Sequence, residues 1–212
     1  MNDQLNAKLL RMKRSGDFSR LESIRAEASG LVAKAAIEIQ QQATMGELPH
    51  ASKFADLKRI NVLIKDVGGI LRKYTPCAQA CSACCHQAIT ITEPEAIRIG
   101  RAIGRTPSMV PALTLAQIES ADAKKREDVA RYSGKACPFL VDNKCSVYDV
   151  RPAICRLHHS MHNDNSLCQL DEVRDVPAMD LTALEMAFVV TQGSYTLADI
   201  RVFFPDARHQ AT

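Results

Sequence analysis

Apolar residues recur at helical spacing along the first third of the chain. One stripe predicts a helix over residues 17 to 45, and a second predicts a helix that ends before the Thr-Pro pair at 75–76. The first stripe is Leu21, Ile24, Ala28, Leu31 and Ala35, and the second is Phe54, Leu57, Ile60, Ile64, Val67 and Leu71. A break at 46–49 separates them, and the Gly-Gly pair at 68–69 weakens the end of the second helix. Two amphipathic helices with a short connection predict an antiparallel hairpin.

Capping patterns mark two further helices. Thr92 and Glu95 have the spacing of a capping box, and the same spacing at 114–117 precedes a polar helix that runs to about Tyr132 and closes at Gly134. The apolar residues expected to bury the first of these helices are Ala96, Ile97, Ile99, Ala102 and Ile103.

The region after Gly134 predicts short elements. An Asp-Asn turn between 139–141 and 146–148 indicates a β-hairpin, and Asp149 is placed to cap a helix that begins near 151–152. The run 89–91 is too short to indicate a strand by itself.

Composition and the absence of long apolar runs indicate the cellular compartment. The 212 residues include no Trp, four Tyr and six Phe, so the core relies on aliphatic side chains, as packed helices do. The amino terminus has no apolar signal region, and no apolar run approaches the roughly 18 residues of a membrane span. We therefore predict a cytoplasmic protein without a membrane association, where eight cysteines favour metal or thiol chemistry over structural disulfides.

Charge is unevenly distributed along the chain. Residues 1–74 carry 13 Lys or Arg against 8 Asp or Glu, whereas the remainder is near neutral. A basic helical arm fits an unknown protein or RNA partner, but such a charge run is more often a solvated helix face.

All eight cysteines fall between positions 77 and 168. They are Cys77, Cys81, Cys84, Cys85, Cys137, Cys145, Cys155 and Cys168, and the histidines in the same region are His86, His158, His159 and His162. Thiolates are soft ligands that select zinc, Cu(I) or iron–sulfur clusters, so this concentration predicts a metal site.

The spacing of the first run allows several kinds of site. Cys77, Cys81 and Cys84 form C-x3-C-x2-C and could face one centre, whereas the adjacent Cys85 must point in another direction. Cys145 and Cys155 would come from another part of the chain. On the expected helix after Pro152, one face would present Cys155, His158, His159 and His162.

Three alternatives compete with this assignment. The C-x3-C-x2-C spacing occurs in radical S-adenosylmethionine enzymes, but a helix precedes it here, no strand repeat follows, and Ala83 stands where those enzymes often have an aromatic residue. One C-x2-C knuckle is present without a second, which weakly supports a zinc finger. A redox dithiol at Cys84-Cys85 would need a strained vicinal disulfide.

The two motifs "CAQACSACC" and "CPFLVDNKCSVYDVRPAICR" together resemble the bacterial cysteine-cluster proteins described as zinc- or iron-chelating domains. The resemblance spans about residues 77–156. It implies that the metal ligands are Cys77, Cys81, Cys84, Cys85, Cys137, Cys145 and Cys155, with Pro138, Tyr148, Arg151, Pro152 and Arg156 in support. Cys168, His86 and His158 are further candidates outside the matched positions. Flagellin lysine N-methylases carry a similar cysteine run and are thought to use an iron–sulfur cluster.

Arg151 and Arg156 could donate hydrogen bonds to an anionic thiolate cluster, or they could form salt bridges elsewhere. The sequence contains no recognisable Ser-His-Asp set, carboxylate pair or nucleotide loop, so it does not decide whether the protein is an enzyme.

The resulting expectation is a mainly α protein. It has a helical hairpin arm at 1–74, a small, loop-rich, metal-stapled domain at 75–170 with at most a short β-hairpin, and C-terminal helices within 171–212 at about 179–192 and 196–204. The expected cofactor is an iron–sulfur cluster or iron with a redox or modification role, and the alternative is a zinc-stabilised helical module that binds a partner.

Overall fold

The computed structural model describes part of the chain. The described residues are 23, 26, 27, 30, 33, 34, 37, 50–78, 80–112, 121–162, 164, 165, 168, 181 and 196–205. They form a mainly helical protein with two small antiparallel sheets, as the sequence predicts, although the second sheet was not expected. Within these described segments, every helix is too short or too polar to cross a lipid bilayer.

The chain divides into two compact units. One contains residues 1–77 and 156–191, and the other contains residues 78–155 and 192–212. The predicted division into an arm at 1–74, a metal-binding domain at 75–170 and C-terminal helices at 171–212 stays a prediction.

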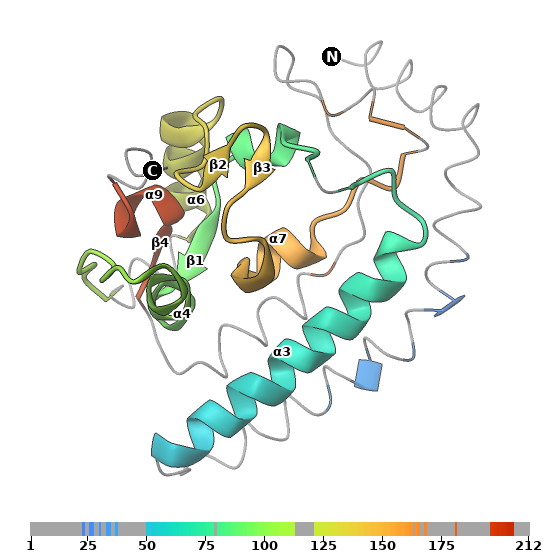
Figure 1. Cartoon of the computed structure of the whole chain (residues 1–212), viewed down its shortest axis with the longest axis horizontal. Coiled ribbons are helices and arrows are strands. Elements are labelled where there is room, and N and C mark those ends of the chain that lie inside the picture. The colour runs from blue at the N-terminus through green and yellow to red at the C-terminus, as the bar shows by residue number, and fades with distance from the viewer. Residues whose placement is uncertain are drawn as a thin grey trace. The chain divides into compact units, whose positions relative to one another are not determined.

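Helix α3, His50–Arg72, is the long helix of the first unit (Figure 1). Ile64, Val67 and Leu71 of the predicted stripe are fully buried. Gly68 is required by a close approach, because a Cβ at this position would lie 2.9 Å from the carbonyl oxygen of Arg156. The glycine that weakens the helix locally therefore lets another segment pack against it.

The predicted first helix lies largely outside the described residues, as do Leu21, Ile24, Ala28, Leu31 and Ala35. Its described positions, such as Glu27, are helical. Glu27 contacts Lys73 at 2.5 Å and also accepts a hydrogen bond from Tyr74, just beyond α3. Glu27 and Lys73 are in contact although they lie 46 positions apart, a contact that the predicted antiparallel hairpin would allow.

In the second unit, strand β1, Thr90–Thr92, pairs with β4, Leu197–Asp199, which follows it by more than a hundred residues (Figure 1). Helix α9, Ile200–Phe203, continues from β4. The prediction of a helix over 196–204 is therefore wrong for its first half, because pairing with β1 imposes strand geometry there. The predicted helix at 179–192 lies outside the described residues.

Helix α4, Glu93–Ile103, begins with the capping box that the sequence predicts, in which Glu95 N–H donates to Thr92 Oγ1. Ala96 and Ile99 are fully buried, whereas Ile97 is 37% exposed and Ala102 is exposed, contrary to prediction. The second predicted helix is present as α6, which spans Ala121–Tyr132. Positions 113–120, which carry its predicted capping pattern, lie outside the described residues.

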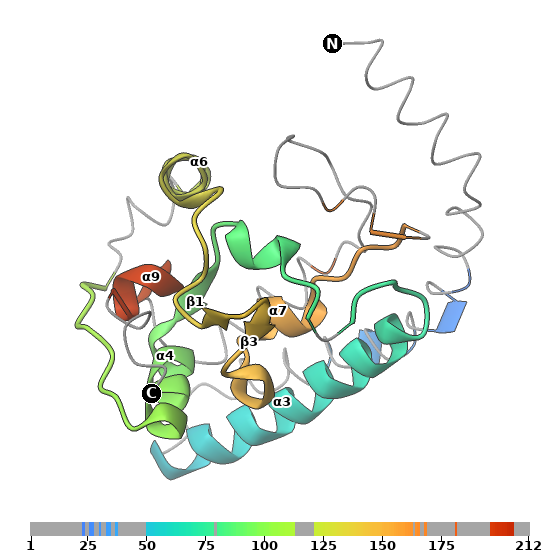
Figure 2. The same ribbon diagram turned by 45° about the horizontal axis from the view of Figure 1, so that its top comes forward.

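The β-hairpin is present with a shifted second strand. Strands β2, Leu140–Val141, and β3, Lys144–Cys145, flank a two-residue Asp-Asn turn whose φ values are 48° and 60° (Figure 2). The predicted strand at 146–148 is wrong, because the tight turn ends at 143 and Tyr148–Val150 form the 3₁₀ helix η2. Such positive φ values at both turn positions match the twist of the strands.

Helix α7, Ala153–Leu157, starts close to the predicted place, but Asp149 lies within η2. The N–H of Ala153 instead donates to Glu95 Oε1 at 2.8 Å. The same carboxylate accepts from Thr92 N–H at 3.1 Å, so one buried side chain satisfies the starts of two helices.

Candidate metal centre

Five cysteines of the second unit form a group that we call the thiol cluster. Its members come from three chain segments and are Cys84, Cys85, Cys137, Cys145 and Cys155. All eight cysteines lie within the described residues, and they are thiols there rather than disulfides.

Core packing brings the three segments together. Cys137 is buried in the apolar core of the second unit, and Cys85, Cys145 and Cys155 pack against that core. The core residues around them are Ile89, Ile91, Ala96, Ile99, Phe139, Val147, Ala198, Ile200, Phe203 and Phe204. The thiols therefore occupy one border of a continuous apolar cluster.

The first segment enters through the 3₁₀ helix η1, Ala83–His86. Three residues per turn direct adjacent side chains away from each other, as the sequence predicts for the vicinal pair. Cys85 packs against the core, whereas Cys84 is exposed. The two side chains remain close enough that a hydrogen bond between them is the main cause raising the pKa of Cys84.

The second segment is tied to the first by main-chain hydrogen bonds. Cys137 N–H donates to the carbonyl oxygen of Cys85 at 2.7 Å. Phe139, two residues on, packs edge-on against Phe204 with ring centroids 5.0 Å apart. The packing of Phe139 and the backbone hydrogen bond thus hold Cys137 beside Cys84 and Cys85. Cys145 lies on strand β3, where it pairs with Leu140 of β2.

Electrostatic coupling shows that the thiols are neighbours. Burial raises the pKa of Cys155 well above its ordinary value, and negative charge on Cys137, Cys84 or Cys145 would raise it further. Burial raises the pKa of Cys137 to about 11 and also raises that of Cys145. Without metal these buried thiols keep their protons at neutral pH, so a metal must displace protons to bind.

Arg151 is a basic residue whose charge acts on Cys84 and Cys145 of the cluster. Its positive charge opposes the rise in the pKa of both Cys84 and Cys145, although it is a minor influence on each. The guanidinium stacks 3.6 Å from the ring centroid of Tyr148 and donates to the Tyr148 carbonyl oxygen at 3.1 Å. These two predicted support residues therefore act together, with the tyrosine orienting the arginine.

Arg156 belongs to the first unit instead. It donates to Asn61 Oδ1 of α3 at 2.5 Å, which favours the alternative that it bonds elsewhere. Pro138 and Pro152 are buried beside their cysteine segments.

Other predicted ligands take different places. Cys77 and Cys168 belong to the first unit, where Cys77 Sγ accepts the N–H of Ser160 at 3.3 Å. Cys81 is half-buried in a turn closed by its N–H and the carbonyl oxygen of Ala78 at 3.1 Å. Their role as ligands stays a prediction.

The predicted face of Cys155 and three histidines is wrong, because α7 ends at Leu157. His158 is exposed, and His162 Nδ1 lies 3.0 Å from Asp164 Oδ1. His86 Nδ1 lies 3.2 Å from the carbonyl oxygen of Ser82, within its own turn.

The donor chemistry of the cluster fits a thiolate-bound metal, because four of its five cysteines lie in or against one core and the fifth, Cys84, is adjacent to Cys85. In the part of the chain that the structure describes, no three Cys, His, Asp or Glu side chains are arranged to hold a metal ion.

Residues 76–175 match the CxxCxxCC family, whose description is "Putative zinc- or iron-chelating domain". The match covers just under half of the chain, so this segment is similar to that family. The match contains every predicted cysteine ligand and supports chelation of zinc or iron by the cysteine motif. No curated protein and no solved structure matches the chain.

The matched segment departs from the spacing in the family's name. The first gap holds three residues rather than two, and Ala80 in that gap has a φ of 76°. An L residue in this left-handed region costs roughly 1–2 kcal/mol relative to its usual conformations. The longer gap is therefore accommodated by a strained backbone just before Cys81.

Sequence analysis missed Arg201, which lies beyond the matched segment. Its charge also opposes the burial that raises the pKa of Cys137. The available signal was a single charged residue within the apolar run 200–204.

Proposed function

We propose that the thiol cluster holds an iron–sulfur centre and that the protein has a redox role, as an electron carrier or a redox sensor. The observation that carries this proposal is the arrangement of the five thiols. They come from three segments and include an adjacent pair, and four of them lie in or against one apolar core. A centre with several metal atoms accepts diverging and more widely spaced thiolates than one tetrahedral ion does.

The surroundings support a redox-active centre. The core beside the cluster is apolar, which lowers the local dielectric, while Cys84 is exposed and gives the site an edge toward solvent. Arg151 supplies positive charge close to Cys84 and Cys145. Burial, nearby charge and hydrogen bonds to sulfur are the features by which proteins set the potential of iron–sulfur centres.

When bound, such a centre supplies one-electron chemistry. The chain's own contribution is to hold the thiolates with the hairpin, η1 and α7, to exclude water from the core side, and to leave Cys84 accessible. Cys81 and Cys77 stay candidates for completing the ligand set.

Anaerobic purification of the full chain tests this proposal. We expect a brown protein with stoichiometric iron and acid-labile sulfide, whose visible absorbance falls on reduction and returns on oxidation. Cys155→Ser, prepared in the same way, should be colourless. A colourless wild-type protein that carries one or two zinc ions instead would contradict the redox role and support the zinc-stabilised module.

A further inference from the structure

The chain segments that carry Cys85 and Cys137 run side by side next to the C-terminal elements. Besides the bond between Cys137 N–H and the Cys85 carbonyl, Gly134 N–H donates to the carbonyl oxygen of His86 at 2.7 Å. These bonds fix two ligand candidates, separated by more than fifty residues, in one register. Beyond these two hydrogen bonds the segments do not continue as a β-ladder, so other groups must hold them together.

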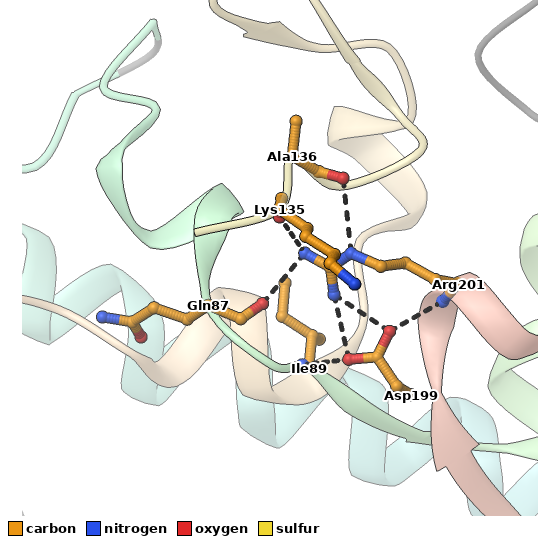
Figure 3. Close-up of polar contacts among 6 residues, drawn as sticks. All are labelled: Gln87, Ile89, Lys135, Ala136, Asp199 and Arg201. Carbon is orange, nitrogen blue, oxygen red and sulfur yellow. Dashed lines mark hydrogen bonds and ion pairs between the residues drawn. The ribbon is translucent and has the colours of Figure 1, made fainter. Parts of the chain in front are cut away.

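Arg201 of α9 provides that connection (Figure 3). Its Nη2 donates to the carbonyl oxygens of Gln87, at 3.1 Å, and Lys135, and its Nε donates to that of Ala136 at 3.3 Å. Each of these carbonyls lies within two residues of a cysteine of the thiol cluster. One planar guanidinium therefore bonds both segments at once.

Asp199 orients the guanidinium from the opposite side (Figure 3). Its two carboxylate oxygens each lie 2.9 Å from Arg201 Nη1, and Oδ2 also accepts Ile89 N–H at 2.7 Å. The side chains of Arg201 and Asp199 are only 8% and 0% exposed. A buried pair of this kind is costly unless its donors and acceptors are satisfied, and here they are satisfied by the cysteine-bearing segments.

We infer that Arg201, oriented by Asp199, is a positioning residue of the thiol cluster that sets the spacing of the Cys85 and Cys137 segments and places a buried positive charge beside Cys137. The inference rests on the proposed function only in that the cluster binds a metal. It adds a requirement from outside the matched segment, because residues 199 and 201 lie beyond position 175. The C-terminal elements thus complete the site.

The test compares variants of the full chain in metal-free form, titrated anaerobically with Co²⁺. Arg201→Lys keeps the charge but replaces the planar fork with a point charge that cannot bond three carbonyls in the same way. Asp199→Asn, which removes the orienting charge, is the second variant if the first does not fold. Arg98→Lys is the matched control, because Arg98 also bonds two carbonyl oxygens, those of Val150 at 3.1 Å and Arg151 at 2.8 Å.

A further control separates positioning from general stability. Ile99→Val removes one methylene from the same core and leaves the hydrogen-bonding groups of Arg201 and its partners unchanged. Unfolding of each metal-free variant by denaturant identifies how far its stability has fallen.

We expect Arg201→Lys or Asp199→Asn to keep the far-UV circular dichroism of the wild type, to bind Co²⁺ roughly 10–100-fold more weakly and to shift the thiolate-to-cobalt absorption band. Arg98→Lys and Ile99→Val should keep both the affinity and the band. Wild-type affinity and spectrum in the Arg201 variant would overturn the inference, as would an equal loss of affinity in Ile99→Val.

The result also separates the two proposals. Absence of iron and sulfide from the wild type overturns the proposed redox function, whereas the Co²⁺ comparison still decides the role of Arg201. A wild-type chain that binds no Co²⁺ overturns the inference about Arg201, whereas iron and sulfide in the anaerobically purified protein still decide the redox function.

Discussion

The two compact units use the same residue types in different ways. In the second unit, thiols from three distant segments are brought together by an apolar core and by backbone bonds between the segments. In the first unit, the side chains with ligand chemistry bond to close neighbours or to the main chain. His162 lies against Asp164 two residues away, and Cys77 accepts the N–H of Ser160.

The difference shows what turns a concentration of cysteines and histidines into a site. Candidate ligands form a site only where the fold brings the separate segments that carry them to one core. The thiol cluster has that support from β1, β4 and the hairpin, whereas the histidines after α7 lack the helical face that would have aligned them.

Replacing one cysteine in each unit tests this comparison, and the difference in metal content between the two variants is the largest effect that we expect. Cys155→Ser should abolish metal binding, because Cys155 is the thiol whose charge couples to three others of the cluster. Cys168→Ser, in the first unit, should retain the metal content of the wild type. Elemental analysis of both variants measures the contrast, and equal metal loss from the two would remove the distinction between the units.

Alkaline pH should destabilise the metal-free second unit. Burial raises the pKa of Cys137 from 9.0 to about 11 in the folded protein, so above pH 9 the unfolded chain loses this proton first. Stability is then full below pH 9 and falls as pH rises toward 11, by on the order of 2–3 kcal/mol for this group.

Denaturant unfolding of the chelator-treated protein across this pH range measures the slope. Cys137→Ala should make the slope shallower without abolishing it, because burial also raises the pKa of Cys145 and Cys155. An unchanged slope in that variant would mean that Cys137 does not contribute.

Loss of the carboxylate that caps two helices should have a smaller effect. Glu95→Gln removes the charge that accepts hydrogen bonds from Thr92 and Ala153, both buried. We expect unfolding to become easier by about 2 kcal/mol, because a buried hydrogen bond to a charged group contributes roughly 1.5–3 kcal/mol. Chemical denaturation measures the change. Glu93→Gln, in the same first turn, is the control and should change stability much less.

The smallest effect is expected in the first unit. His162→Ala removes the contact with Asp164 and should cost about 1 kcal/mol of folding free energy, the typical contribution of one hydrogen bond. Metal content should remain that of the wild type. A loss of metal in this variant that exceeded the loss in Cys168→Ser would place the histidine in the site after all.

Local features of the fold could be predicted from the sequence. The capping box at Thr92 and Glu95 and the burial of Ile64, Val67 and Leu71 depend on residues three or four positions apart, and the structure confirms them. The divergence of Cys84 and Cys85 likewise follows from their being adjacent.

Long-range pairing could not be predicted in the same way. Residues 197–199 have a pattern compatible with a helix, and only β1, more than a hundred residues earlier, makes them a strand. The second hairpin strand was misplaced because the turn type sets the register. Arg201 went unnoticed because its partners are main-chain carbonyls, which every residue carries and no sequence pattern marks.

Mass-spectrometric mapping of thiol alkylation, with and without bound metal, tests the central claim that the thiol cluster is the metal site. Cys84 is decisive because its side chain is exposed. Its raised pKa slows alkylation, so labelling with iodoacetamide is continued until Cys84 of the metal-free protein has fully reacted. In the metal-loaded protein we expect Cys84, Cys85 and Cys145 to be protected while Cys168 reacts as before. Equal alkylation of Cys84 in the two forms would contradict the assignment.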